Sequence, residues 1–317
     1  MNYIVLDLEW NQSEEKRKEN KLIPFEIIEI GAMKLDGKKN VVGEFSELIK
    51  PEVYSDMHHI TQNLIQMEME ELERGKSFPV VMEEFLNWCG KSDFIFCTWG
   101  PTDLIELQRN MRYYKIPLFS KKPFPYLDVQ KLFSIEFEDG KQRRTLEYAI
   151  DYLEIEKDIA FHRADSDAYY TAKVLERFYH PAIFHNYSFD TYRLPKTRAD
   201  EIHVVFDDYE KYISRAFADK LTAMDDREVI STRCFICGAN TKKKIPWFTM
   251  NGKHYYTVVT CERHGLLKGK IRMRKSIDDR VYVVKTMKQV SEETMQELIS
   301  RKEQSRENHK DKRKKTK

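Results

Sequence analysis

The sequence predicts an α/β protein in which helices flank a mixed sheet, and two observations support this prediction. Three strand-like segments come first in the chain, at residues 3–10, 25–35 and 41–49. Helical and strand-like patterns then alternate, which is typical of sheets covered by helices. With 317 residues, of which 41% are apolar, the chain is long enough for two domains and too apolar for wholesale disorder.

The elements follow from the spacing of the apolar residues. Residues 3–10 are aliphatic or β-branched except for two acidic side chains, which predicts a buried strand. Asp36-Gly37 separates the next two strand-like segments and favours a hairpin. Farther along, the pattern predicts a strand at 93–98 and helices at 63–74, 79–90, 102–114, 145–153 and 165–178.

Charged side chains are distributed unevenly along the chain. The net charge is only +2, but residues 1–230 hold 31 basic and 43 acidic side chains, whereas residues 231–290 hold 14 basic and 3 acidic ones. A basic module of this kind suits a polyanion, because Lys and Arg displace counterions from phosphates. A solvated basic surface is the alternative. The expected parts are an acidic body at 1–185, a helical connector at 186–230 with one helix near 208–224, a basic strand-rich module at 231–290 and a disordered basic tail at 291–317.

Composition also bears on the compartment. No apolar run approaches the roughly 18–20 residues that a membrane span needs. The N-terminus enters a strand-like run directly, so we expect no secretion signal. Five cysteines do not suit a disulfide scaffold and favour a reducing compartment. We therefore expect a cytoplasmic protein without a membrane partner.

Asp7 and Glu9 are the first candidates for chemistry. Residues two apart project from the same side of a strand, and two carboxylates on an apolar strand need partners or a metal. A solvated edge strand is the alternative, but the run from residue 3 to residue 8 is too apolar for a fully exposed edge. We favour a metal site.

Two further acidic positions fall at predicted helix starts. Asp103 ends the sequence WGPTD, where a strand turns into a helix. In the segment HRADSDA, Asp165 can cap the following helix, which places Asp167 in its first turn and His162 in the preceding loop. Taken alone, Asp103 could be an ordinary carboxylate at a helix N-terminus, and His162 and Asp167 could be a surface loop histidine and a first-turn carboxylate that serves the helix dipole.

Taken in order, Asp7-x-Glu9, Asp103 and His162-x-Ala164-x-x-Asp167 resemble the three exonuclease motifs of the DEDDh superfamily. That superfamily includes RNase T and the proofreading subunit of DNA polymerase III, and its members have a ribonuclease H-like fold. The resemblance covers roughly residues 1–180. The sequences WGPTD, YLDVQKLF and TLE resemble the branch that trims structured RNA 3′ ends, such as histone-mRNA and small-RNA exonucleases.

The resemblance implies a metal-dependent 3′–5′ exonuclease that releases nucleoside 5′-monophosphates from a single-stranded or 3′-overhang nucleic acid, RNA in preference to DNA. Two Mg²⁺ or Mn²⁺ ions would be held by Asp7, Glu9, Asp103 and Asp167. His162 would take a proton from the attacking water. A DNA proofreading or repair exonuclease, and a nucleic-acid-binding module with a degenerate active site, are the alternatives.

The same resemblance predicts contacts with the substrate. His59 and Thr61 belong to a segment similar to a substrate-side loop of the superfamily. Trp10-Asn11 stands where many relatives carry small or hydroxylated residues after the Glu, so it would alter the shape of the terminal-nucleotide pocket.

Three cysteines and a histidine form a second candidate metal site. Cys234-x2-Cys237 and Cys261-x2-His264 are separated by 23 residues, and this ligand set predicts one structural Zn²⁺ in a zinc ribbon. A redox Cys-x-x-Cys lacks the expected βαβ context, and incidental thiols are the other alternative.

Basic and aromatic side chains interleave in the same module, which suits single-stranded nucleic acid. Such a module could also hold a ribosome or another ribonucleoprotein. For the aromatic residues, packing into the module's core is the alternative. The candidates are Lys242, Lys243, Lys244, Trp247 and Tyr256.

Overall fold

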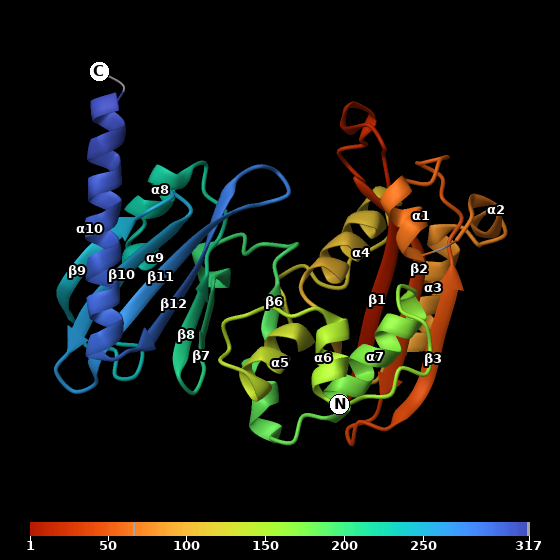
Figure 1. Ribbon diagram of the computed structural model, residues 1–317, viewed down its shortest axis with the longest axis horizontal. Coiled ribbons are helices and arrows are strands. Elements are labelled where there is room, and N and C mark those ends of the chain that lie inside the picture. The colour runs from red at the N-terminus through yellow and green to blue at the C-terminus, as the bar shows by residue number, and fades with distance from the viewer. Residues whose placement is uncertain (66, 316–317) are drawn as a thin grey trace. The chain divides into compact units, whose positions relative to one another are not determined.

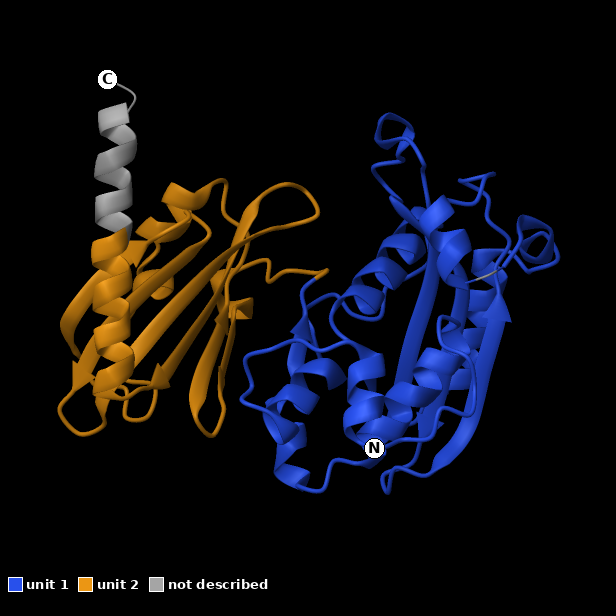
Figure 2. Cartoon of the chain, viewed as in Figure 1, with its two compact units in different colours: residues 1–191 blue, residues 192–317 orange. Residues whose placement is uncertain are grey.

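A computed structural model describes residues 1–65 and 67–315, with side chains as far as Gln304 in the last helix. The chain forms two compact units, Met1–Thr191 and Tyr192–Lys317 (Figure 2). Among the described residues, no helix combines the length and the apolar character needed to span a membrane. The predicted combination of an α/β body and a smaller β-rich part is confirmed.

The first unit is built on a six-stranded mixed sheet with strand order β3-β2-β1-β4-β5-β6 (Figure 1). β1 pairs antiparallel with β2 and parallel with β4, and β2 pairs antiparallel with β3 as the predicted hairpin. β5 continues the parallel part, and β6 closes the sheet antiparallel. The strands are β1 (Asn2–Gln12), β2 (Phe25–Leu35), β3 (Val41–Leu48), β4 (Phe94–Thr98), β5 (Phe124–Asp128) and β6 (Ser188–Asp190).

Helices cover both faces of this sheet, and β1 shows which face is which. Ile4, Leu6 and Leu8 share a hydrophobic core with α3 (Phe78–Cys89) and α4 (Thr102–Tyr113). Val5, on the opposite side of the strand, belongs to the core formed by the helices of the other face. Those helices are α5 (Val129–Phe137), α6 (Leu146–Tyr152) and α7 (Ala164–Glu176). Odd-numbered residues of β1 therefore project toward α7.

Two details of the first unit differ from the prediction. The expected helix at 63–74 is split into α1 (His59–Ile65) and α2 (Met69–Leu72). β5 and α5 have no counterpart among the predicted elements. Short 3₁₀ helices occur at Lys16–Lys18 and Pro181–Asn186, and a third, at Arg198–Asp200, lies in the second unit.

The second unit is a six-stranded antiparallel sheet with strand order β7-β8-β12-β11-β10-β9. Two short helices, α8 (Lys220–Asp225) and α9 (Arg227–Ile230), pack on one face, and α10 (Glu292–Lys315) packs on the other (Figure 1). The strands are β7 (Ile202–Val205), β8 (Tyr209–Ile213), β9 (Lys242–Thr249), β10 (His254–Cys261), β11 (Gly265–Lys275) and β12 (Val281–Gln289).

The predicted helical connector at 186–230 is wrong. β7 and β8 pair with each other, and β8 pairs with β12, so they belong to the second sheet. In place of a helix near 208–224 the chain forms β8 and the short α8, which Asp219 caps by accepting from the Thr222 N–H. Tyr212 on β8 is fully buried beside Ile271 and Val283, so burial in a sheet outweighs the helical pattern.

The prediction of a disordered tail is wrong for the first turns of α10. Leu298 is 1% exposed and packs on Ile245 and Val258 of the sheet. Met295, Leu298 and Ile299 have the i, i+3, i+4 spacing of a narrow apolar stripe, which anchors the helix despite its charge. Residues 316–317 of that tail lie outside the described residues.

Candidate active site and metal-binding cluster

Three of the predicted metal ligands meet where β1 passes under the start of α7. Asp7 and Glu9 are odd-numbered residues of β1 and project toward α7, whose first turn carries Asp167. One carboxylate oxygen from each of these three residues lies within 4.8 Å of the others. Asp103 lies in the first turn of α4, is 6% exposed, and is close enough to Asp7 for their charges to interact.

Burial and mutual repulsion make these carboxyl groups hard to ionise. Burial, and then the charges of Asp103 and Glu9, raise the pKa of Asp7 well above its ordinary value. Burial, followed by the charge of Asp167, raises the pKa of Glu9 to about 8. Burial also raises the pKa of Asp103 to about 7, although hydrogen bonds from the backbone oppose this change. A cluster of oxygen ligands with uncompensated negative charge fits hard divalent cations.

Gly31 lets α7 begin against the sheet. In β2 it is the register partner of Asp7. A Cβ at this position would lie 2.0 Å from the backbone carbon of Ala164 and 2.1 Å from the backbone nitrogen of Asp165. Only a residue without a side chain permits this approach, which brings Asp167 over Asp7 and Glu9.

An ion pair between a buried carboxylate and a partly exposed arginine fixes the same junction. Glu29 of β2 lies opposite Glu9 in the sheet and is 1% exposed at its side chain. Its carboxylate accepts hydrogen bonds from Arg163 Nη2 at 2.7 Å and Nε at 3.1 Å, and from the Ala164 N–H at 3.2 Å. Neither Glu29 nor Arg163 was predicted to matter. The available signal was an acidic residue inside the apolar strand FEIIEIGAMKL.

His162 is exposed in the loop before α7, as predicted. Its φ of 68° lies in the left-handed region, where residues other than glycine are uncommon. Its backbone N–H donates to Asp167 Oδ1 at 3.4 Å, which ties the loop to the carboxylate cluster. Asp165 is not the N-cap that the sequence predicts, because Arg163 precedes the helix and Asp165 lies within its first turn.

The predicted substrate-side residues lie around the end of β1. Trp10 is half-buried with its ring 5.7 Å from that of Phe25. Thr61 is 7% exposed and donates through Oγ1 to the Trp10 carbonyl at 3.2 Å, so it also has a structural role. His59 is exposed, and its Nδ1 is 2.9 Å from the Glu14 carboxylate.

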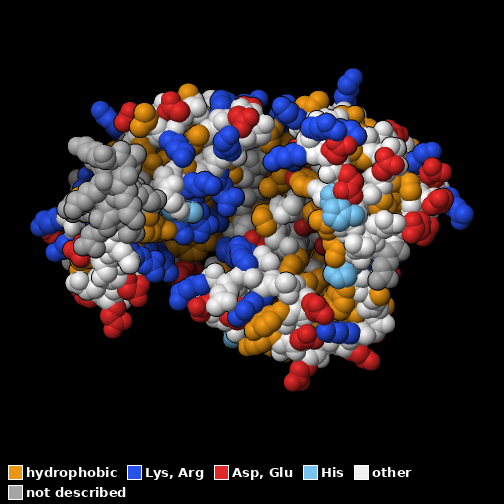
Figure 3. All heavy atoms as spheres, turned by 45° about the horizontal axis from the view of Figure 1, so that its top comes forward, with side chains coloured by type: hydrophobic (Ala, Val, Ile, Leu, Met, Phe, Trp, Pro, Cys, Tyr) orange, Lys and Arg blue, Asp and Glu red, His pale blue; other side chains and the backbone are white. Residues whose placement is uncertain are grey.

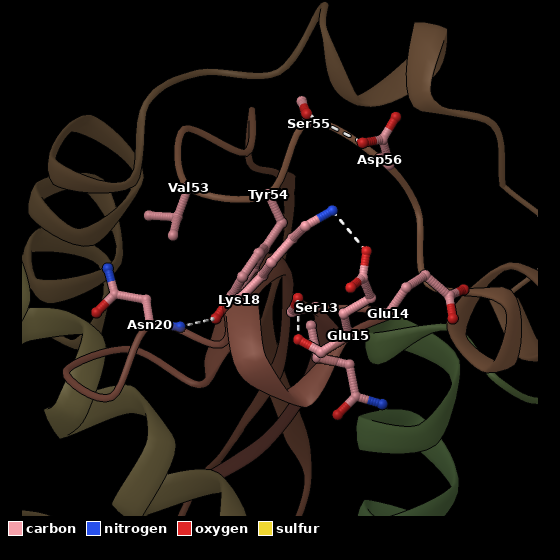
Figure 4. Close-up of a pocket in the computed structure, with 10 residues that line it drawn as sticks. Ser13, Glu14, Glu15, Lys18, Asn20, Val53, Tyr54, Ser55 and Asp56 are labelled. Atoms are coloured by element: carbon pink, nitrogen blue, oxygen red, sulfur yellow. Dashed lines mark hydrogen bonds and ion pairs between the residues drawn. The ribbon is translucent and has the colours of Figure 1, made fainter.

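Asn11 holds this loop in place, a role that was not predicted. It is fully buried, and its amide donates to the Asp56 carbonyl at 2.9 Å and accepts from the His58 N–H at 2.9 Å. A hollow of about 530 Å³ opens nearby, between residues 12–20 and 53–56 (Figure 4). Asp7, Glu9, Asp103 and Asp167 do not line it.

Cys234, Cys237, Cys261 and His264 come together in the second unit as a single cluster. Cys234 Sγ lies 3.4 Å from His264 Nδ1, Cys261 Sγ lies 3.6 Å from the same nitrogen, and the Sγ atoms of Cys237 and Cys261 are 3.7 Å apart. Ligands of a tetrahedral Zn²⁺, with bonds of about 2.3 Å to sulfur and about 2.0 Å to nitrogen, lie roughly 3.5–3.8 Å apart. The cluster therefore has the spacing of a zinc site.

The basic and aromatic candidates of this unit divide between different surfaces. Lys242, Lys243 and Lys244 are exposed on β9, an edge strand, where charged side chains also discourage pairing with another sheet. Trp247 packs in the core beside α8 and α9, and its Nε1 donates to the Ile230 carbonyl at 3.0 Å. This packing favours the core interpretation of Trp247 over a nucleic-acid contact. Tyr256 lies on the opposite face, beside α10.

Comparison with known proteins identifies the family of the first unit. Residues 4–175 match the exonuclease family represented by RNase T. Because this match covers more than half of the chain, the chain belongs to that exonuclease family. The predicted resemblance to DEDDh exonucleases is thereby confirmed.

Individual relatives are distant. A 3′-5′ exoribonuclease 1 from Rattus norvegicus is 18% identical over 167 residues, which are 50% of this chain and 46% of the rat protein. The chain therefore spans about half the length of that relative. The nuclease domain of 3′hExo, a DEDDh family member bound to rAMP, is 18% identical with a TM-score of 0.48, covering 56% of this chain and 90% of that one. Pop2p of S. pombe, in a form with Mg²⁺ and Mn²⁺ bound, is 16% identical with a TM-score of 0.41, covering 55% of this chain and 81% of that one.

Proposed function

We propose that this protein is a metal-dependent 3′–5′ exonuclease that removes nucleoside 5′-monophosphates from RNA in preference to DNA. The observation that carries the proposal is the meeting of Asp7, Glu9 and Asp167 within 4.8 Å on a chain of the exonuclease family. The 3′–5′ direction and the RNA preference are supported by the motif resemblance and by the rat relative, a 3′-5′ exoribonuclease.

The carboxylates fit two Mg²⁺ or Mn²⁺ ions, because burial and repulsion make their ionised forms unfavourable until cations supply positive charge. Asp7, Glu9, Asp103 and Asp167 would hold these ions. When bound, the ions would supply Lewis-acid polarisation of the scissile phosphate and would neutralise charge on the attacking and leaving oxygens. Asp7 and Glu9 would fix one side of the site from a rigid strand, and Asp167 the other side from a helix.

His162 would take the proton from the attacking water, because an imidazole changes charge near neutral pH. Its exposed position in the loop leaves the ring accessible to substrate. The hydrogen bond from its backbone N–H to Asp167 would orient the loop relative to the carboxylates. Glu29 and Arg163 would act as positioning residues, since they touch the helix start and not the reacting atoms.

In the second unit, one Zn²⁺ held by Cys234, Cys237, Cys261 and His264 would stabilise the fold. Free thiolates for this purpose suit a reducing compartment such as the cytoplasm. A ribosome or another ribonucleoprotein stays a predicted partner of this basic unit.

The proposal is tested with matched single-stranded RNA and DNA oligonucleotides carrying a label at one end. With Mg²⁺, a 3′ label should leave at once as a mononucleotide, whereas a 5′ label should remain on a ladder of shortening products. RNA should be consumed faster than DNA, and EDTA should stop both reactions. Release of the 5′ label first, or turnover in EDTA, would contradict the proposed activity, and faster loss of DNA would favour the repair alternative.

Asp167 has a matched control on the same helix turn. Asp167→Asn removes a carboxylate of the cluster and should lower turnover by at least about 100-fold, the usual scale for losing an essential electrostatic group. Asp165→Asn removes the same charge two residues away, from a carboxylate outside the cluster. Equal losses in both variants would show that general charge, and not metal ligation, sets the rate.

A further inference from the structure

One face of the second sheet carries a row of cations along β11. Residues on the α8–α9 side of this strand are buried, among them Leu267 and Ile271. The even-numbered residues from 268 to 274 project from the opposite face; they are Lys268, Lys270, Arg272 and Arg274. Residues two apart on an antiparallel strand are about 7 Å apart, so this row is roughly 20 Å long.

Neighbouring strands extend the positive surface. Lys288 of β12 is the register partner of Lys268, and His254 of β10 is the partner of Arg272. Figure 3 shows Lys and Arg side chains gathered on the face of the second unit that this view presents. The surface defined by Lys268, Lys270, Arg272, Arg274 and Lys288 is named the β11 face below.

The cations of the β11 face repel one another. Burial, followed by the charges of Arg272 and Lys268, lowers the pKa of Lys270 to about 8. Burial and the charge of Lys288 lower the pKa of Lys268. The negative charge of Glu297 on α10 opposes this change, but its effect is weaker than theirs. A polyanion bound across the face would relieve this repulsion.

An aromatic ring lies within the row of cations. Tyr256 of β10 is the register partner of Lys270 and is half-buried. Its ring centroid is 5.7 Å from Lys270 Nζ and 5.9 Å from Lys268 Nζ. The surface therefore offers charge for a phosphate backbone and a ring on which a base can stack.

The helix α10 borders the β11 face. Leu298 anchors it on Ile245 and Val258, that is, on the β9–β10 part of the sheet. C-terminal to Leu298, α10 carries two more cations. The charge of Arg301 lowers the pKa of Lys268, and Lys302 Nζ lies 5.8 Å from the centroid of the Phe248 ring.

We propose that the β11 face, with Tyr256, binds single-stranded nucleic acid through its phosphate backbone. This surface belongs to the second unit and does not include the edge-strand lysines of β9. A nucleic acid is favoured over an acidic peptide because the ring lies among the cations, where bases and phosphates alternate along one ligand. The role of the bound strand as substrate rests on the proposed function, whereas binding itself needs no turnover.

The test uses the full-length chain with Asp7→Asn, so that the strand is not degraded, and a fluorescein-labelled oligouridylate. Fluorescence anisotropy gives Kd across a series of salt concentrations. The test variant adds Lys270→Ser and Arg274→Ser. The control adds Lys220→Ser and Arg227→Ser, which remove the same charge from α8 and α9 on the opposite face. Zinc content and circular dichroism verify that both proteins are folded.

Each lost phosphate contact should reduce the slope of log K against log salt by about 0.7, so the test variant should lose roughly 1.4 and the control almost nothing. Tyr256→Leu should weaken binding at least about fivefold and leave the slope unchanged, because stacking is not ionic. The proposal is overturned if the test variant binds like its parent, if both double variants lose the same slope, or if polyglutamate of equal charge competes as well as RNA.

Hydrolysis of a nucleotide p-nitrophenyl ester by the protein with Asp7 restored reports the proposed catalytic function separately. RNA binding without ester hydrolysis would leave the β11 face supported and remove the nuclease proposal. If the ester is hydrolysed but substitutions in the β11 face do not change the affinity for RNA, the nuclease proposal is supported and the β11 face proposal is overturned.

Discussion

Replacing Gly31 with alanine should separate the start of α7 from the sheet without changing a single charge. The added Cβ would lie 2.0 Å from the Ala164 carbonyl carbon, and ordinary contact begins near 3.4 Å, so the two backbones must part by about 1.4 Å. Both contacting groups are backbone, and no rotamer change can relieve the clash. Because Asp167 lies in the helix turn that must move, its carboxylate should move away from Asp7 and Glu9 by a similar distance.

A misplacement of about 1 Å in a catalytic group can cost on the order of 100-fold in rate, so we expect at least that loss in kcat for Gly31→Ala. Overpacking should also lower the free energy of unfolding by about 1–3 kcal/mol. Single-turnover kinetics on labelled RNA at saturating Mn²⁺ would measure the rate, and urea unfolding would measure the stability.

Gly269→Ala in the second unit is the matched control. Its Cβ would meet side-chain atoms of Thr257, Trp247 and Met287 at 2.6–2.9 Å, so it should destabilise the second sheet. At saturating RNA it should leave the rate per folded molecule unchanged, because it lies outside the carboxylate cluster; a disturbance of the neighbouring β11 face would change the affinity for RNA and not the rate of bound RNA. A Gly31→Ala protein that is folded and has the parent rate would refute the argument that this close approach positions Asp167.

Three further predictions address the ion pair, the titration and the zinc cluster. Arg163→Met leaves the buried Glu29 carboxylate without its partner and should cost about 3 kcal/mol in urea unfolding, and a cost below about 1 kcal/mol would contradict its role. Without metal, the pKa of Glu9 is about 8 in the folded state and near 4.5 in the unfolded state. The folded state therefore binds the proton more tightly, so Tm in EDTA should fall as the pH rises from 5 to 8, and divalent ions should restore it. A Tm that rises over this range would contradict the prediction. Cys234→Ser with Cys237→Ser should abolish one bound Zn²⁺ per chain by elemental analysis, and the prediction fails if the parent, purified without chelator, contains none.

Features that depend on local spacing could be predicted from the sequence. Alternation along β1 places Asp7 and Glu9 on one face whatever surrounds them. The two short pairs Cys234-x2-Cys237 and Cys261-x2-His264 predict a four-residue cluster in the same way, and the structure brings the four side chains together.

Features that depend on distant partners could not be predicted. Glu29 and Arg163 are 134 positions apart, and their pairing exists only once α7 lies on β2. β5 contains Pro125, which weakens a strand pattern, and it is held by neighbours from other parts of the chain. The strand β8 was missed because residues 208–224 also suit a helix, and pairing with β7 and β12 decides in favour of a strand.

The buried amide of Asn11 has a consequence for how this protein could be redesigned. One strand carries Glu9 and, two residues later, the side chain that holds the backbone of Asp56 and His58. The metal-ligand candidates and the predicted substrate-side loop would therefore depend on the same strand, because a shift of the loop would also displace the strand that carries the carboxylates. A loop transplanted from another exonuclease would keep its specificity only if its residue at the position of Asn11 came with it.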